Sequence, residues 1–150
     1  MPQLSFTSPI GGLTLFEFDG AIVALDWGWV DENDETPLLA EARQQLDDYF
    51  AGRRQTFELP LAPHGTAFQR KIWDALLAIP YGQVRRYGEL AAEAGSAARA
   101  VGGACGRNPI PIIIPCHRVV GHAGSLGGYS GEDGIETKRF LLELEGALVP

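Results

Sequence analysis

Residues 87–105, YGELAAEAGSAARAVGGAC, decide the fold of the second half of this 150-residue chain. Residues 87–94 predict a short helix that Gly95 ends, and Ser96 is a candidate N-cap for a second helix over residues 97–105. Two short helices joined by a turn that contains glycine have the form of a helix-turn-helix. Many small helical pairs share that form, so the pattern alone is weak evidence for DNA binding.

The second of these predicted helices carries almost only small side chains. Alanine, glycine and valine surround one long residue, Arg99. Such a helix can approach another surface closely, and we expect Arg99 to project from it alone. The alternative is an ordinary solvated arginine on an exposed face.

Upstream of this pair, Thr66 is a plausible N-cap for a helix whose apolar residues follow the 3.6-residue period until Pro80. The closely spaced Pro60 and Pro63 mark the best domain boundary. We therefore expect an N-terminal subdomain over residues 1–62 and a C-terminal subdomain over residues 63–150.

The N-terminal part predicts a small sheet covered by a helix. Two β-rich runs flank Asp19-Gly20, which is a strong hairpin signal. Pro37 then opens a helical pattern that Gly52 closes. Strands and helices in this order predict an α+β chain.

The charges are distributed unevenly along the chain. The total of 12 basic and 19 acidic residues gives a net charge of -7, which by itself disfavours a nucleic-acid partner. Residues 65–122, however, carry 7 basic and only 3 acidic residues. This middle segment is the candidate anion-binding surface, although solvated surface charge is an equally plain explanation.

Membrane spans and disulfide frameworks are not expected. No run approaches the ~20 apolar residues of a membrane helix, and the first residues lack the features of a signal peptide. Cys105 and Cys116 are too few for a disulfide framework and are expected to be free thiols in a reducing compartment. These features predict a soluble, cytoplasmic protein.

Residues 108–120, NPIPIIIPCHRVV, carry the sharpest chemical signal. An apolar run bounded by prolines predicts a buried, extended segment that ends at Cys116. Nearby His117 and Arg118 can lower the pKa of the thiol from about 8.5 and so favour the nucleophilic thiolate. The alternative is a cysteine that only fills a small apolar site.

Several segments together resemble the O6-alkylguanine-DNA alkyltransferases, also called methylated-DNA–protein-cysteine methyltransferases. IPCHRVVG resembles the active-site signature of that family, and RAVGGA, GSLGGYSG, LLELEG and the whole of residues 65–91 also fit. The N-terminal SPIGGLTL fits more loosely. The resemblance implies a ribonuclease-H-like α/β subdomain followed by a winged-helix-like DNA-binding subdomain.

The resemblance also implies a reaction. Cys116 would attack the alkyl carbon on guanine O6, keep the alkyl group as a thioether and act only once, without a cofactor. His117 would take the thiol proton through a water molecule, Glu145 would hold the imidazole, and Asn108 would form hydrogen bonds within the active-site turn. Glu145 could instead be a solvated carboxylate at a helix end, but it opposes the helix dipole there and therefore needs a local partner.

Further residues are implied to bind the substrate, which is double-stranded DNA containing O6-alkylguanine. The Tyr87 hydroxyl would donate to guanine N3, the Val119 carbonyl would recognise the exocyclic amine, Ser130 would face O6, and Tyr129 would line the pocket. Arg99 would fill the space left by the flipped nucleotide. The small neighbours of Arg99 would let the helix lie in the minor groove; these are Ala97, Ala98 and Ala100.

The chain departs from some relatives in two places. Glu132 and Asp133 put acidic residues in the loop beside the implied pocket, where some relatives have a short glycine-rich link. Residues 1–64 contain no cysteine and only His64 as a histidine, so we expect no N-terminal zinc site. A zinc site formed by the two cysteines with His117 and His122 does not match a standard ligand spacing.

Two competing functions lead to different predictions. A non-catalytic lesion binder would lack the cysteine of the motif, but Cys116 is present. A cysteine hydrolase would use a Cys-His pair, but adjacent side chains on an extended segment point in opposite directions, so Cys116 and His117 would need a turn to cooperate. The implied chemistry requires only a monomer and no membrane.

Overall fold

The structure is a computed structural model that describes residues 1–126 and 134–147. The chain divides into two compact units, Met1–His64 and Gly65–Pro150. Within the described residues, no helix combines the length and the apolar character needed to cross a bilayer.

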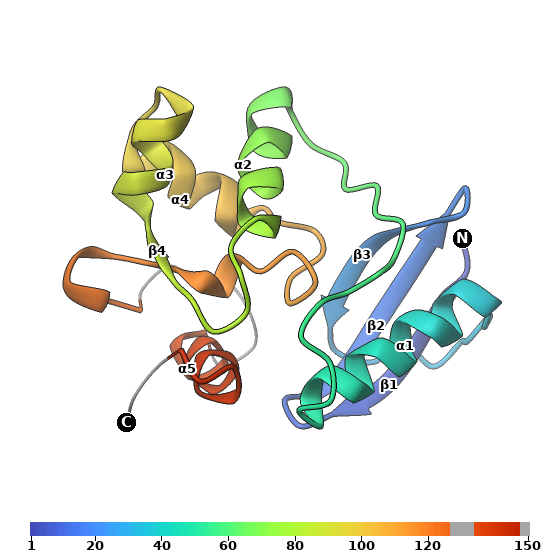
Figure 1. The fold of residues 1–150 in the computed structure, drawn as a ribbon. Helices are drawn as coiled ribbons and strands as arrows, with labels where there is room; N and C mark the ends of the chain where they lie inside the picture. The colour runs from blue at the N-terminus through green and yellow to red at the C-terminus, as the bar shows by residue number, and fades with distance from the viewer. Residues whose placement is uncertain (127–133, 148–150) are drawn as a thin grey trace. The chain divides into compact units, whose positions relative to one another are not determined.

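The N-terminal unit is a three-stranded antiparallel sheet with one helix on it (Figure 1). The strands are β1 (Gln3–Ser8), β2 (Gly11–Phe18) and β3 (Ala21–Trp27), in that spatial order. Asp19 and Gly20, with φ of 51° and 78°, form the β2–β3 turn, because a two-residue hairpin turn of this kind needs positive φ at both positions. This confirms the predicted hairpin. The sequence reasoning had not identified β1.

Helix α1 (Pro37–Phe50) covers the sheet and has the predicted bounds. The Thr36 hydroxyl accepts a hydrogen bond from the Leu39 amide at 3.1 Å, and Pro37 fills the first position of the helix, where no amide is needed. The apolar face of the helix completes the core of the unit; it consists of Leu39, Ala42, Leu46 and Tyr49. The chain then runs beside β3, where Pro60 and Ala62 exchange backbone hydrogen bonds of 2.9 Å with Ile22.

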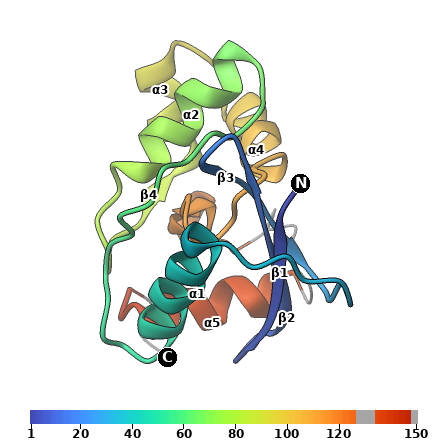
Figure 2. The same cartoon turned by 90° about the vertical axis from the view of Figure 1, so that its right-hand side faces the viewer.

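The C-terminal unit begins with three helices that contact one another (Figure 2). They are α2 (Ala67–Leu77), α3 (Tyr87–Ala94) and α4 (Ala98–Gly106). Thr66 caps α2 as predicted, and its hydroxyl accepts a hydrogen bond from the Gln69 amide at 3.1 Å. The buried Trp73 of α2 donates to the Ala104 carbonyl of α4 at 2.8 Å and ties these two helices together.

The turn between α3 and α4 differs from the prediction in one detail. Gly95 ends α3 in the left-handed conformation, with φ of 65°, as expected. Ser96, however, does not cap α4: its amide donates back to the Ala91 carbonyl at 2.9 Å, and the N-cap position of α4 is Ala97, which forms no side-chain cap. Ser96 therefore completes the end of α3, because the amide two residues past a helix commonly bonds a carbonyl of its last turn.

The remaining elements surround the segment that carries Cys116. Strand β4 (Arg85–Arg86) pairs in parallel with β5 (Val119–Val120), which follows the short 3₁₀ helix η1 (Cys116–Arg118). A second 3₁₀ helix, η2 (His122–Gly124), and the helix α5 (Ile135–Leu144) come next. Helix α5 contacts η1, and this contact brings the end of the chain to the cysteine segment.

Candidate active site

The lead-in to Cys116 is buried, as predicted, but it is not extended. All residues from Ile110 to Val120 are buried. The Ile113 amide donates to the Pro111 carbonyl at 2.9 Å, and the Cys116 amide donates to the Ile114 carbonyl at 2.8 Å. Each bond spans only two residues, so the segment contains two consecutive tight turns. The prediction of an extended lead-in is therefore wrong.

One of these turns is strained. Ile112 has φ of 73°, a left-handed conformation that a β-branched residue rarely adopts, and it is the central residue of the first turn. The second turn is centred on Pro115, whose φ of -82° and ψ of 66° are ordinary for this kind of turn. Strain of the kind seen at Ile112 costs about 1–3 kcal/mol and persists only where surrounding contacts impose it.

Asn108 provides two of those contacts. Its side-chain nitrogen donates to the Ile114 carbonyl at 2.8 Å, and its side-chain oxygen accepts from the Ile110 amide at 3.0 Å. The Asn108 side chain thus bridges the segment just before Cys116. The side chain uses both a donor and an acceptor here, which an amide supplies, and these are hydrogen bonds within the turn that precedes Cys116.

The 3₁₀ turn η1 places two consecutive side chains, those of His117 and Arg118, on one buried carboxylate. His117 Nε2 lies 2.7 Å from Glu145 Oε2, and both side chains are fully buried. Arg118 donates from Nε to Glu145 Oε1 at 2.8 Å and from Nη2 to Oε2 at 3.0 Å. Glu145 therefore has the local partners that the helix-dipole argument required.

The turn also changes an argument about Cys116 and His117. An extended segment would have pointed these two side chains in opposite directions, but residues Cys116–Arg118 form a 3₁₀ turn. The backbone geometry needed for a cooperating Cys-His pair is therefore present. Backbone direction does not separate a hydrolase from a transferase here.

The contact with Glu145 fixes the protonation of His117. The Glu145 carboxylate can only accept hydrogen bonds, so Nε2 carries the imidazole proton and Nδ1 holds a lone pair. Burial lowers the pKa of His117, more strongly than its bond to Glu145 raises it. Nδ1 is buried and has no hydrogen-bond partner within residues 1–126 and 134–147. The ring is therefore a neutral base with a lone pair available for a proton.

The thiol of Cys116 is protonated at rest, contrary to the expectation of a lowered pKa. Burial raises the pKa of Cys116 to about 11, although the Asn108 side chain and the charge of Lys138 oppose this rise. Arg118 does not activate the thiol because its guanidinium is bound to Glu145. A resting thiol with this pKa needs a base to take its proton when it reacts.

Lys138 is a site residue that the sequence reasoning missed. It is fully buried on α5, and its charge offsets part of the rise in pKa that burial causes at both Cys116 and Cys105. Burial in turn lowers the pKa of Lys138. A periodicity signal was available, because Lys138 precedes the buried Leu141 and Leu142 by three and four residues and so lies on the apolar face of the helix.

Two of the implied substrate residues, Tyr87 and Val119, are described by the structure. Tyr87 is half-buried at the start of α3, and Lys138 Nζ lies 5.6 Å from the centre of its ring. Burial raises the pKa of Tyr87, so its hydroxyl stays protonated and can donate. Val119 is fully buried in β5. Tyr129 and Ser130 lie outside the described residues.

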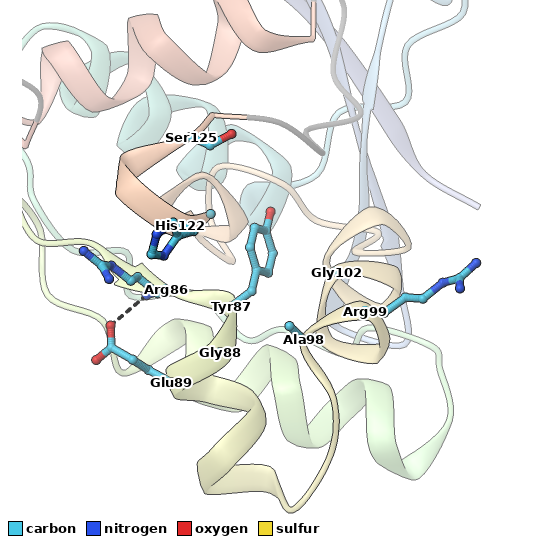
Figure 3. Close-up of a pocket in the computed structure, with 10 residues that line it drawn as sticks. Arg86, Tyr87, Gly88, Glu89, Ala98, Arg99, Gly102, His122 and Ser125 are labelled. Carbon is cyan, nitrogen blue, oxygen red and sulfur yellow. Dashed lines mark hydrogen bonds between the residues drawn. The ribbon is translucent and has the colours of Figure 1, made fainter.

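A pocket of about 820 Å³ opens beside Tyr87 (Figure 3). The start of α3, the first half of α4 and the loop after β5 line it, with Arg99 and Ala98 among the contributing residues. Figure 3 shows Arg99 pointing away from Tyr87, off the outer side of α4. Arg99 and its small neighbours are all exposed, as expected of a helix face that approaches another surface; the neighbours are Ala97, Ala98 and Ala100.

Fold and site together define a class: a two-unit α+β protein whose helix-turn-helix unit holds a buried thiol next to a histidine-glutamate pair. The chain belongs to the 6-O-methylguanine DNA methyltransferase family. The family model of the ribonuclease-like domain matches residues 5–63, and that of the DNA binding domain matches residues 67–147. The resemblance noted in the sequence and the expected fold class are both confirmed.

Individual relatives match over nearly the full length. A methylated-DNA–protein-cysteine methyltransferase from Mycobacterium bovis is 55% identical over 154 residues, covering 95% of this chain and 91% of the relative. The constitutive enzyme of that name from Bacillus subtilis is 49% identical over 151 residues, covering 92% and 91%. The crystal structure of Mycobacterium tuberculosis OGT in complex with DNA superposes with a TM-score of 0.88 at 44% identity, covering 100% of this chain and 96% of that one.

Proposed function

We propose that the chain repairs DNA directly, by moving an alkyl group from O6 of guanine in double-stranded DNA onto Cys116. The reaction is a single turnover, because the thioether that forms on Cys116 is not reversed. The chemistry belongs to residues 63–150, requires no cofactor and requires only one copy of the chain. A free thiol nucleophile depends on a reducing compartment, so we also propose a cytoplasmic location.

The observation that carries the proposal is the buried base next to the buried nucleophile. His117 is adjacent to Cys116, is neutral, and keeps a lone pair on Nδ1 because Glu145 occupies Nε2. Such a base can take the thiol proton through one water molecule, as the family resemblance implies. Arg118 holds the Glu145 carboxylate in place through two hydrogen bonds, so that Glu145 can stabilise the imidazolium that forms.

The bond changes balance without an oxidant or reductant. The Cys116 sulfur forms a bond to the alkyl carbon while the bond from that carbon to guanine O6 breaks, and the electron pair of the broken bond stays on the purine. The thiol loses its proton to His117, and the purine gains one proton in becoming guanine. The Tyr87 hydroxyl, donating to N3, would neutralise charge on the leaving base during this step.

Recognition of the base is what the family resemblance implies for three further residues. The Val119 carbonyl would accept from the exocyclic amine, Ser130 would face O6, and Tyr129 would line the pocket. The alkylated nucleotide must leave the stack to reach Cys116, at a cost of a few kcal/mol. Arg99 would occupy the vacated space while Ala97, Ala98 and Ala100 allow the helix into the minor groove.

The proposal is tested by following the alkyl group. Duplex DNA with one O6-methylguanine is incubated with the protein and with a Cys116→Ala variant, and intact and peptide masses are recorded. We expect a single methyl on the Cys116 peptide, in stoichiometric amount with restored guanine, and none on the variant. Binding of the DNA with an unmodified thiol would instead establish a lesion sensor. Neither binding nor transfer would refute both functions.

A further inference from the structure

Two adjacent arginines have different environments in β4. Arg85 donates from both terminal nitrogens to the two carboxylate oxygens of Glu93, each at 2.8 Å. Arg86 contributes only its backbone amide, which donates to Glu89 at 3.0 Å. Its exposed guanidinium forms no ion pair with any acidic residue in the ranges 1–126 and 134–147. Arg86 is thus a cation that remains available to an anion.

The parallel pairing of β4 with β5 brings Arg86 close to His122. Arg86 is in register with Val120, and the chain leaves both strands in the same direction, into α3 on one side and into Gly121 and His122 on the other. Both Arg86 and His122 line the pocket described above. Figure 3 shows them together on one flank of Tyr87, whereas Arg99 lies on the opposite flank.

An acidic residue that lines the pocket already has partners for its negative charge. Among the described residues that line the pocket, Glu89 is the one carboxylate. One of its oxygens accepts the Arg86 amide, and the other lies 3.8 Å from Arg85 Nη2. The negative charge of Glu89 therefore lies at the N-terminal end of α3, which is favourable for an anion, and near the guanidinium of Arg85. The Arg85–Glu93 pair and the Glu89 contact also fix the junction of β4 and α3, so the Arg86 backbone is held in place before any ligand binds.

We propose that Arg86 and His122 grip one phosphate of the DNA backbone beside the nucleotide that enters the pocket. This inference rests on the proposed function. A guanidinium binds phosphate oxygens with two parallel hydrogen bonds, and an imidazole N–H adds a third donor. Arg99 lies on the opposite flank of Tyr87. The phosphate contact therefore holds the DNA backbone at the point where the nucleotide must rotate out of the stack. Phosphate contacts set the position of a protein on DNA without reading sequence, which suits repair at any site.

Binding measurements with single-charge variants test the grip. Affinity for a labelled duplex with one O6-methylguanine is measured at several salt concentrations for wild type, Arg86→Gln, His122→Gln and the control Arg53→Gln, which removes an exposed charge from the N-terminal unit. We expect Arg86→Gln to weaken binding about tenfold and to reduce the salt slope by about one. His122→Gln should weaken binding less, and Arg53→Gln should match wild type.

Neutral backbone substitutions locate the contact. Methylphosphonates replace the phosphates near the lesion one at a time. We expect one position at which the methylphosphonate weakens DNA binding by wild type but does not weaken binding by Arg86→Gln. Equal losses in both proteins at every position would overturn the grip, as would an Arg86→Gln variant that binds like Arg53→Gln. A His122→Gln variant that binds DNA with wild-type affinity would show that His122 takes no part in the phosphate contact.

Transfer from a free O6-methylguanine base separates this inference from the proposed function. The free base has no phosphate, so Arg86→Gln should react with it at the wild-type rate, which also shows that the variant is folded. A slower reaction would indicate a structural role for Arg86 and overturn the grip. If wild type transfers the methyl group from DNA while Arg86→Gln binds DNA like wild type, the phosphate contact is refuted and the proposed function is not. If wild type transfers no methyl, the proposed function fails.

Discussion

His117 has two nitrogens with separate tasks, and a glutamine can replace only one of them. The amide of Gln can donate to Glu145, but it cannot accept the thiol proton. We expect His117→Gln to slow methyl transfer by at least about 100-fold with little change in DNA affinity, since general-base catalysis contributes at least this much. Single-turnover transfer measured by mass spectrometry checks this. A rate within tenfold of wild type would contradict it, and His64→Gln serves as the control.

The lowered pKa of His117 also affects stability. Burial places the pKa of the folded state below that of the unfolded state, so the unfolded chain binds more protons at acid pH. The contribution of this residue is therefore complete above the ordinary histidine pKa of about 6.5 and is lost as the pH falls below it. We expect urea midpoints to fall between pH 7 and pH 5 more steeply in wild type than in His117→Gln. Parallel pH profiles would show that His117 does not titrate in this way.

At the scale of single residues, the sequence predicted what local pattern determines. The motif around Cys116 and the need for a partner at Glu145 were both visible. Two features depended on burial instead. The pKa of the thiol rises because the surrounding chain excludes water, and Arg118 is bound to Glu145 rather than to the thiol. Neither effect can be read from neighbours along the chain.

At the scale of elements, the strained turn at Ile112 needs the Asn108 bridge. Asn108→Ala removes hydrogen bonds to the Ile110 amide and the Ile114 carbonyl, and we expect a loss of about 1–3 kcal/mol in the free energy of unfolding. Transfer should slow as well, because the lead-in to Cys116 loses its support. Urea unfolding and transfer rates check this together.

Asn33→Ala is the matched control for that experiment. Asn33 accepts a hydrogen bond from the Ser5 amide at 2.9 Å in the N-terminal unit. We expect this variant to lose stability while keeping its transfer rate. An Asn108→Ala variant with the same behaviour as Asn33→Ala would show that the bridge supports the fold but not the site.

Elements were predicted well where short-range signals set them. Thr66, Gly95 and the Asp19-Gly20 turn act through their own backbone, and all three have the predicted roles. The segment before Cys116 was predicted to be extended because apolar residues and prolines favour that conformation. Tertiary contacts instead impose two turns there, including a left-handed Ile112 that no local preference would select.

At the scale of the whole molecule, net charge is a poor guide to DNA binding. The chain carries -7, yet residues 65–122 are basic. We expect affinity for lesion-containing DNA to fall more than tenfold between about 50 mM and about 200 mM salt, because bound phosphates release counterions. A fluorescence anisotropy titration measures this. A salt-independent affinity would mean that the basic segment does not contact the backbone.

The burial of the Cys116 sulfur has a consequence after the reaction. Cys116 is buried, with 5% of the residue exposed, and an added methyl group has to fit among close-packed neighbours. Extra methyl groups in a packed core cost about 1–3 kcal/mol. A molecule that has reacted should therefore melt at a lower temperature than a fresh one, which calorimetry on the two forms would reveal. The methylated protein would then be less stable than the unreacted protein. A cell that degrades destabilised proteins would remove the reacted molecules first.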